Sequence, residues 1–194
     1  MHFANIHSTH STIQLILPHA GSWLSVVPSP ALGLHLRPAE FIPVLKYRLG
    51  VPVYSSAGLC PACSRPSDRM GDHSLGCRTT SDRIANVGAA ASAGASLSKA
   101  YERKIKETAE ACRLQGLVFL PFAMETLGGL HSGAAAQVKQ LAAVLARSKG
   151  LVEGEVTAQL FGKLSLTLMR GNALMISSRC QDDNFPPAEI DGVE

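Results

Sequence analysis

The stretch CPACSRPSDRMGDHSLGC, from Cys60 to Cys77, places three cysteines and one histidine close together in a chain with two other cysteines. The spacing is Cys60-x2-Cys63-x9-His73-x3-Cys77. Cysteine thiolates and imidazole nitrogens are the ligands that zinc prefers, and structural zinc sites use four of them in a tetrahedron. A cysteine pair two residues apart can grip one ion from a tight turn. We therefore predict a loop closed around a structural zinc ion.

The residues around these four ligands are rich in Pro, Ser and Gly and lack the apolar periodicity of a regular element. Such a loop needs a cross-link to hold one conformation, and a bound metal supplies it. Four protein ligands leave no open coordination position, which indicates a structural role rather than a catalytic one. Asp72 precedes His73 and is a candidate to orient its ring. The alternative is three thiols and a histidine that bind no metal.

Basic residues gather around the same stretch. The net charge of the whole chain is +3, which does not by itself require a nucleic-acid partner. Between residues 46 and 83, however, six basic residues stand against three acidic ones. The six are Lys46, Arg48, Arg65, Arg69, Arg78 and Arg83. We expect them to contact the phosphates of DNA or RNA. A solvated surface without a ligand is the alternative.

Composition also indicates the cellular compartment of the protein. The chain contains no apolar run long enough for a membrane-spanning helix. Its apolar run near the N-terminus is shorter than the hydrophobic region of a signal peptide. Five cysteines, an odd number, do not fit a secreted disulfide framework. We expect an intracellular protein, nuclear or cytoplasmic and not secreted, with no membrane partner.

The expected fold class is α+β and mainly helical, with a loop that is cross-linked by zinc. Proline and glycine positions and shifts in composition divide the chain into six segments. These are an irregular N-terminus at 1–21, a helical lead-in at 22–55, the zinc module at 56–85, a Gly/Ala/Ser linker at 86–96, a helical block at 97–179 and an acidic, disordered tail at 180–194.

Apolar periodicity predicts the elements of the helical block. Three helices are expected, from Ser98 to Gly116, from Ser132 as N-cap to Gly150, and from Val156 to the Gly-Asn pair at 171–172. The run LVFLPF at 117–122 predicts a short buried strand.

The lead-in segment predicts one further helix. Pro38 suits the first position of a helix, and Gly50 is a plausible end. Phe41, Leu45 and Leu49 would then share the apolar face. Pro43 lies inside this pattern, so the alternative is a helix that starts at Pro43.

Several of these stretches resemble a known family. LGLHLRPAEFIPVLKYRLGVPVY, CPACSRPSDRMGDHSLGC and the following DRI resemble the C-terminal region of non-LTR retrotransposon proteins. In that family a reverse transcriptase is followed by a Cys-Cys-His-Cys zinc motif and a restriction-like endonuclease. The stretches AYERKIKETAEACRLQGLVFLPFAMETLGG and KLSLTLMRGNALMISSR are similar to the same family. The resemblance covers roughly residues 22–180, in two blocks.

The resemblance implies a partial restriction-endonuclease-like domain over 97–179. Such enzymes cut DNA with magnesium held by clustered carboxylates, while a lysine assists the attacking water. Lys104 matches the family's lysine, and Glu125 would line the remnant of the site. The alternative for both residues is ordinary surface charge. The family's carboxylate segment has no counterpart here, because no Asp or Glu lies between Arg83 and Lys99.

We therefore expect a degenerate domain and a non-catalytic, retrotransposon-derived zinc-binding fragment with non-specific nucleic-acid binding. Magnesium would matter only if residual nuclease activity exists. Two alternatives stay open. One is a metal-dependent DNA endonuclease acting in target-site cleavage, and the other is a remnant open reading frame without function.

Overall fold

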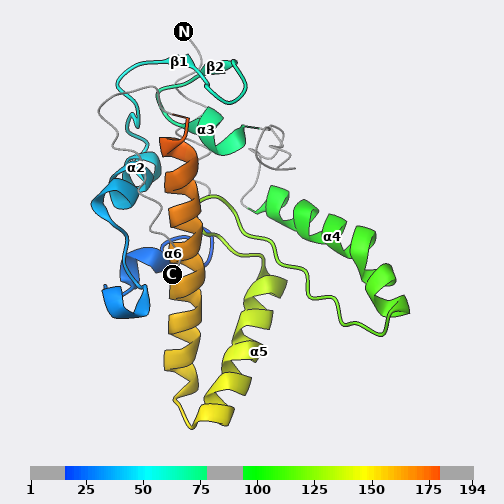
Figure 1. Ribbon diagram of the computed structural model, residues 1–194. Helices are drawn as coiled ribbons and strands as arrows, with labels where there is room; N and C mark the ends of the chain where they lie inside the picture. Colours follow the sequence, from blue (N-terminus) through cyan, green and yellow to red (C-terminus); the bar gives the residue numbers. More distant parts are fainter. Residues whose placement is uncertain (1–15, 78–93, 180–194) are drawn as a thin grey trace, which may run out of the picture. The chain divides into compact units, whose positions relative to one another are not determined.

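The computed structural model describes residues 16–77 and 94–179, and the described fold is mainly helical, as predicted. The elements, labelled in Figure 1, are η1 (Ser22–Ser25), η2 (Pro30–Leu32), α2 (Pro38–Arg48), β1 (Gly58–Leu59), β2 (Pro66–Ser67), α3 (Asp72–Gly76), α4 (Ala95–Leu114), α5 (Ser132–Lys149) and α6 (Glu153–Ser177). Within the described ranges, the antiparallel pair β1–β2 is the one sheet.

The chain divides into two compact units, each assembled from stretches that are distant in sequence. The first unit combines Met1–Val27 with Asn86–Ser165, and the second combines Pro28–Ala85 with Leu166–Glu194. Helix α6 contributes its beginning to the first unit and its end to the second. The six-segment division expected from composition stays a prediction.

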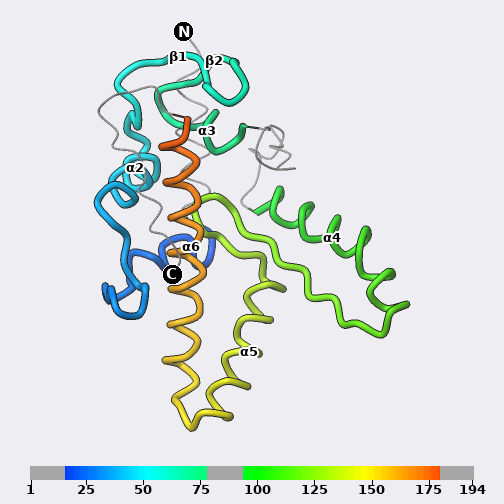
Figure 2. The backbone as a smooth tube through the Cα atoms, viewed as in Figure 1, coloured from blue at the N-terminus to red at the C-terminus, as the bar shows by residue number. Residues whose placement is uncertain are grey.

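The core of the first unit lies between α5 and the beginning of α6, which run side by side and are joined by a short turn (Figure 2). One face of α5 is buried and carries Ala134, Val138, Ala142 and Ala146. These residues recur every four positions, so they form one stripe along the helix. Their small side chains pack against Val156 and Phe161 of α6. Gly150, in the left-handed conformation with φ 64°, ends α5 as expected.

Helix α4 contributes little to the core. Leu97 is its one buried residue, and the ring of Tyr101 stacks on His131 with 3.8 Å between the ring centroids. The segment at 117–122 that follows α4 is not a strand, and Val118 is 85% exposed. The prediction of a buried strand there was wrong. Apolar, β-branched composition favours a strand only where a partner strand accepts its backbone hydrogen bonds.

In the second unit, α2 begins at Pro38 rather than at Pro43. The Glu40 carboxylate accepts a hydrogen bond from the backbone N–H of Arg37 at 2.8 Å, which secures the first turn. The buried residues of α2 are Pro43 and Val44, whereas Phe41 and Leu49 are exposed. The prediction that Phe41, Leu45 and Leu49 form the buried face of α2 was therefore wrong. Tyr47 packs against the core and lies one turn after Pro43 and Val44, so this side of the helix is the buried one.

The core of the second unit is a small cluster that joins distant residues. Val53, Tyr54, Leu75 and Ile176 are buried together, and Tyr47 and Met175 pack against them. The Tyr54 hydroxyl lies 2.5 Å from Ser74 Oγ and donates to the Ile176 carbonyl at 2.9 Å. This cluster therefore attaches α3 to the end of α6.

The predicted helices of the C-terminal block are confirmed, with changes at their ends. Helix α4 begins at Ala95, three residues earlier than expected, and the N-cap of α5 is His131 rather than Ser132. Helix α6 continues through Gly171 and Asn172 to Ser177. Burial of residues beyond this pair, Ile176 among them, outweighs the low helix propensity of Gly and Asn.

The predicted tail at 180–194 lies outside the described residues, as does the predicted linker at 86–96 except for residues 94–96, where α4 begins. Residues 97–179 form helices and irregular segments, with an isolated bridge between Met124 and Leu130. The restriction-endonuclease-like character of this block stays a prediction.

Candidate metal centre

The first two ligands lie on the loop between β1 and β2. Leu59 pairs with Pro66, so the loop runs from Cys60 to Arg65. The Cys60 N–H donates to the Arg65 carbonyl at 2.9 Å, and the Ser64 N–H donates to the Cys60 carbonyl at 2.8 Å. Ser64 adopts a left-handed conformation, with φ 56°. The tight loop turns Cys60 and Cys63 toward the same point.

The other two ligands are set by α3. His73 lies in the first turn of this helix and Cys77 is its C-cap, four residues later. Residues four apart share one face of a helix, so both side chains face the same way. Gly71 precedes the helix with φ 92°, a conformation that residues other than glycine seldom adopt. The sharp reversal at Gly71 brings α3 back toward the β1–β2 loop.

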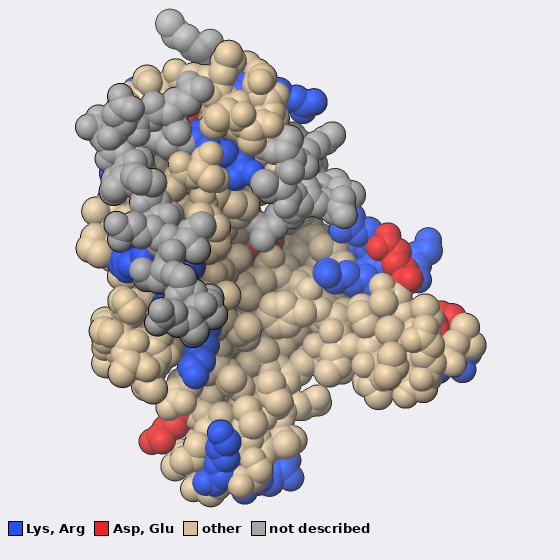
Figure 3. Space-filling view, viewed as in Figure 1, with Lys and Arg blue, Asp and Glu red and all other residues tan. Residues whose placement is uncertain are grey.

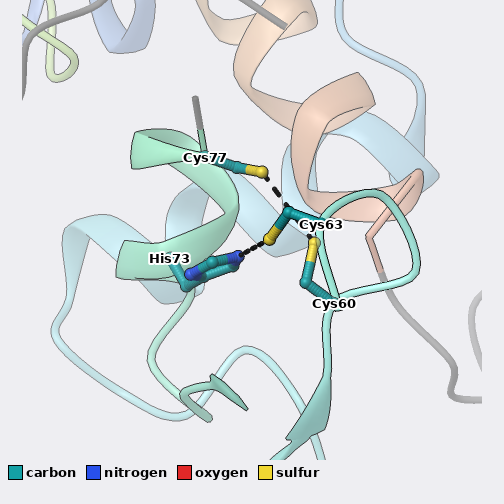
Figure 4. Close-up of side chains that lie close together, drawn as sticks. All are labelled: Cys60, Cys63, His73 and Cys77. Carbon is teal, nitrogen blue, oxygen red and sulfur yellow. Dashed lines mark hydrogen bonds between the residues drawn. The ribbon is translucent and has the colours of Figure 1, made fainter. Parts of the chain in front are cut away.

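The four side chains converge, as Figure 4 shows, and their ligand atoms all lie within 4.8 Å of one another. Cys60 Sγ and Cys77 Sγ are 3.9 Å apart, and His73 Nε2 is 3.2 Å from Cys63 Sγ. In tetrahedral zinc sites, Zn–S bonds of about 2.3 Å place two sulfurs about 3.8 Å apart. The predicted grouping of Cys60, Cys63, His73 and Cys77 is thus confirmed, and its size suits one metal ion.

The centre is closed on most sides. Cys60 and Cys77 are 1% and 5% exposed, while Cys63 and His73 are half-buried. Three sulfurs and one imidazole nitrogen supply four donors, which fits a structural site without an open position. Donors of this softness suit zinc better than magnesium or calcium, which prefer oxygen.

The electrostatics of the thiols favour a cation at this point. A backbone hydrogen bond from Arg65 lowers the pKa of the Cys63 thiol, but burial and hydrogen bonds with Cys60 and Cys77 raise that pKa overall. Neighbouring thiolates repel one another, so the ionised state needs a compensating charge. A bound divalent metal supplies that charge and deprotonates its coordinating thiols.

Two hydrogen-bonded residues anchor the far side of α3. Ser74 is buried against the Tyr54 hydroxyl, and the Tyr47 hydroxyl of α2 donates to the Asp72 carboxylate at 3.0 Å. Burial, followed by the charge of Asp72, raises the pKa of Tyr47 well above its ordinary value, so Tyr47 stays a donor. Helix α3 is therefore held by Tyr47 of α2 and by Tyr54, which precedes β1.

The residue that sequence reasoning missed is Asp68. Its carboxylate accepts the backbone N–H of His73 at 2.7 Å and that of Asp72 at 3.1 Å. Asp72, the residue expected to orient His73, instead accepts from Tyr47. No N-cap pattern in the sequence marks this residue, because Asp68 lies three residues before Gly71, the N-cap of α3.

The predicted nucleic-acid contacts fall into three groups. Arg65 and Arg69 are exposed beside the centre, and Arg69 Nε donates to the Tyr54 carbonyl at 3.4 Å. Lys46 and Arg48 of α2 are half-buried, and burial lowers the pKa of Arg48. Arg78 and Arg83 lie outside the described residues.

The two predicted catalytic residues lie at different levels of α4: Lys104 is part of the helix, and Glu125 contacts its first turn. Lys104 is exposed in the middle of the helix, whereas half-buried Glu125 accepts from Ser96 Oγ in its first turn at 3.4 Å. Eight residues of helix separate Ser96 from Lys104, a rise of about 12 Å. Across residues 16–77 and 94–179, the group at Cys60 is the one set of three or more His, Cys, Asp or Glu placed to hold a metal.

No helix among the described residues has the length and apolar character to cross a membrane. No family model, curated protein or solved structure matches the chain.

Proposed function

We propose that this chain is a zinc-organised nucleic-acid-binding fragment derived from the C-terminal region of a non-LTR retrotransposon protein. The observation that carries the proposal is the convergence of Cys60, Cys63, His73 and Cys77 within 4.8 Å. The resemblance of the same stretch to the family's zinc motif supports it. In this proposal the metal is zinc, and its role is to hold the β1–β2 loop against α3.

The donor set supports zinc as the resident metal. Cys60, Cys63 and Cys77 supply thiolates and His73 supplies a neutral nitrogen, so the loaded centre has a net charge of about −1. The metal centre itself therefore does not attract phosphate. Nucleic-acid binding has to come from the arginines placed around it.

Arg65 and Arg69 are the residues best placed for phosphate contacts. Both are exposed, and Arg65 lies in the loop that also carries Cys60 and Cys63. A zinc ion that fixes this loop also fixes the Arg65 backbone, which lowers the entropy lost when the side chain binds. Flexible arginines on an unstructured loop would bind more weakly.

Helix α4 is a weaker candidate for the same task, although it carries several basic residues. Both of its arginines are paired with acids along the helix, with Arg113 2.7 Å from Glu110 and Arg103 4.0 Å from Glu107. Blue and red side chains accordingly lie next to each other over α4 (Figure 3). A mixed surface of this kind attracts phosphate less than a surface of single sign.

The helical block at 97–179 completes the proposal as the remnant of the family's endonuclease domain. Lys104 and Glu125 would be survivors of its site, without the carboxylates that hold magnesium. The proposed fragment therefore binds nucleic acid and does not cut it.

The test combines metal analysis with binding measured over a range of salt concentrations. Purified full-length chain should contain one zinc per molecule and bind a duplex oligonucleotide at low salt. The double variant Arg65→Gln, Arg69→Gln should flatten the slope of log affinity against log salt by about 2, since each phosphate contact contributes about 0.9. Lys99→Gln with Lys106→Gln removes the same charge from exposed positions of α4 and should leave the slope unchanged.

Four results would contradict the proposal. Absence of stoichiometric zinc would remove the metal centre. Absence of oligonucleotide binding at low salt would contradict the assigned phosphate contacts. An equal decrease of the salt slope in the two double variants would contradict them as well. Magnesium-dependent nicking of DNA that is lost in Lys104→Ala would show an active endonuclease instead.

A further inference from the structure

We propose that Asp68 positions His73 for metal binding by holding the first turn of α3 with its carboxylate. The inference rests on the proposed metal centre and adds a residue that touches no ligand atom. Its basis is the pair of hydrogen bonds that Asp68 accepts from the backbone N–H groups of Asp72, at 3.1 Å, and His73, at 2.7 Å.

The need for such a residue follows from the length of α3. The helix runs only from Asp72 to Gly76, and so short a helix does not form by itself in water. Its first N–H groups have no partner within the helix. Asp68 satisfies two of them, and an ionised acceptor makes stronger hydrogen bonds than a neutral one.

One of the two N–H groups belongs to the metal ligand itself. Fixing the backbone of His73 fixes the origin of its side chain, whose Nε2 lies 3.2 Å from Cys63 Sγ. Cys77 follows on the same face one turn later, so its position depends on the same start of α3.

Asp68 also connects the two halves of the centre. It directly follows Ser67 of β2, and β2 pairs with the strand that leads into Cys60 and Cys63. Its carboxylate therefore joins the loop that carries two ligands to the helix that places the other two. This connection shapes the centre before the metal arrives and so reduces the conformational entropy lost on binding.

Asp72 offers a matched control within the same centre. It carries the same charge and lies next to His73, but its carboxylate accepts from the Tyr47 hydroxyl. Removing either aspartate removes one negative charge near the cation. Only removal of Asp68 takes away the acceptor that holds His73.

The experiment titrates the full-length chain and its variants with cobalt, followed by displacement with zinc. Cobalt bound to thiolates in a tetrahedral site has characteristic visible absorption, and competition gives the zinc affinity. We expect Asp68→Ala to lower the zinc affinity by about 10- to 100-fold, the usual effect of losing a group that orients a ligand. Asp72→Ala removes the same charge and the Tyr47 hydrogen bond but leaves the N–H of His73 with its acceptor, so it should lower the affinity clearly less than Asp68→Ala does. Asp68→Asn should recover part of the loss because an amide oxygen can still accept these hydrogen bonds.

The cobalt spectrum separates positioning from a general loss of stability. At saturating cobalt, the Asp68→Ala spectrum should shift toward that of His73→Ala, in which one nitrogen ligand is absent. The Asp72→Ala spectrum should match the wild type. A shift that Asp68→Asn reverses would support the inference even where Asp68→Ala itself folds poorly.

Equal losses of affinity in Asp68→Ala and Asp72→Ala would overturn the inference, because the hydrogen bonds of Asp68 to α3 would then have no effect of their own. An unchanged affinity in Asp68→Ala would overturn it as well, while leaving the metal centre intact. Failure of the wild-type chain to bind cobalt or zinc would remove the proposed function together with the inference.

Discussion

The hydroxyl of Tyr54 donates a hydrogen bond to the backbone carbonyl of Ile176 at 2.9 Å, although 122 positions separate the two residues. That carbonyl belongs to the last turn of α6 and also accepts the backbone N–H of Arg179 at 3.2 Å. The same hydroxyl lies 2.5 Å from Oγ of Ser74, the neighbour of His73. One side chain thus links the end of α6 to the helix that carries the ligand His73.

Replacement of Tyr54 by phenylalanine should destabilise the second unit. The change leaves the ring in the core but removes one of the two donors to the Ile176 carbonyl and the hydrogen-bond partner of the buried Ser74 hydroxyl. We expect the free energy of unfolding to fall by about 1–3 kcal/mol, the usual cost of a buried polar group left without a partner. Denaturant unfolding of the zinc-loaded chain measures the effect.

Tyr101→Phe is the matched control for this prediction. The Tyr101 hydroxyl makes a long contact of 3.5 Å with Gln137 Nε2, and its ring should keep the stack on His131. Loss of the Tyr101 hydroxyl should lower the free energy of unfolding by less than about 1 kcal/mol. A cost for Tyr54→Phe no larger than that of Tyr101→Phe would argue against the link described above.

Removal of the metal should loosen the residues from about 50 to 77 and the last turns of α6 together. The β1–β2 loop and α3 are short elements that the metal cross-links, and α6 ends on the core that α3 completes. Hydrogen exchange measured with and without a chelator tests this. The buried face of α5, which contains Val138 and Ala142, should keep its protection. Identical exchange in both conditions would contradict the prediction.

Gly71→Ala should weaken both the second unit and its metal affinity. Gly71 has φ 92°, and a side chain in left-handed backbone costs about 1–2 kcal/mol. An added Cβ would lie 3.5 Å from Val53 Cγ2, an ordinary contact, so the cost is conformational rather than steric.

Gly171→Ala is the contrasting variant. Gly171 lies inside α6 and an added Cβ would meet no atom within 4 Å. Alanine there should stabilise the helix by about 0.5–1 kcal/mol. Thermal unfolding of both variants gives the comparison, and a stabilising Gly71→Ala would show that α3 can begin without the left-handed residue.

The stability of the first unit should fall as the pH drops below about 6.5. His19 stacks on Phe161 with 3.8 Å between the ring centroids, and burial, with the charge of Lys139 second, lowers its pKa from 6.5. The unfolded chain then takes up the proton at a higher pH than the folded chain, so acidification favours unfolding between those two pKa values. NMR titration of His19 should give a pKa below that of a model peptide.

His19→Asn isolates this effect from acid release of the metal. Asparagine tolerates the positive φ of 69° at this position and does not titrate. Stability of the variant should depend less on pH between about 7 and 5 than that of the wild type. An unchanged dependence would mean that His19 is not the group responsible.

Much of the metal centre could be predicted because its information is local. The ligands span residues 60–77, and the spacing of two cysteines around a turn and of His73 and Cys77 along a helix already restricts where their side chains can point. The helices α4 and α5 were predictable for a similar reason, since helical periodicity is written in neighbouring residues.

Other features depended on contacts that no local pattern contains. The strand expected at 117–122 found no partner strand in the described fold, and α2 buried Pro43 and Val44 rather than Phe41 and Leu49. The Gly-Asn pair at 171–172 did not end α6, because the buried residues that follow favour continued helix. In the two helices the energy of packing exceeded a local preference of less than about 1 kcal/mol per residue.

The sequence by itself determined which four residues are the candidate metal ligands and that the described chain is mainly helical, because donor chemistry and periodicity are properties of short stretches. Tertiary structure alone decided that Asp68 holds His73, that Asp72 turns to Tyr47, and that Tyr54 reaches Ile176. Hydrogen bonds of this kind depend on where a folded backbone brings distant atoms, and spacing along the chain does not contain that information.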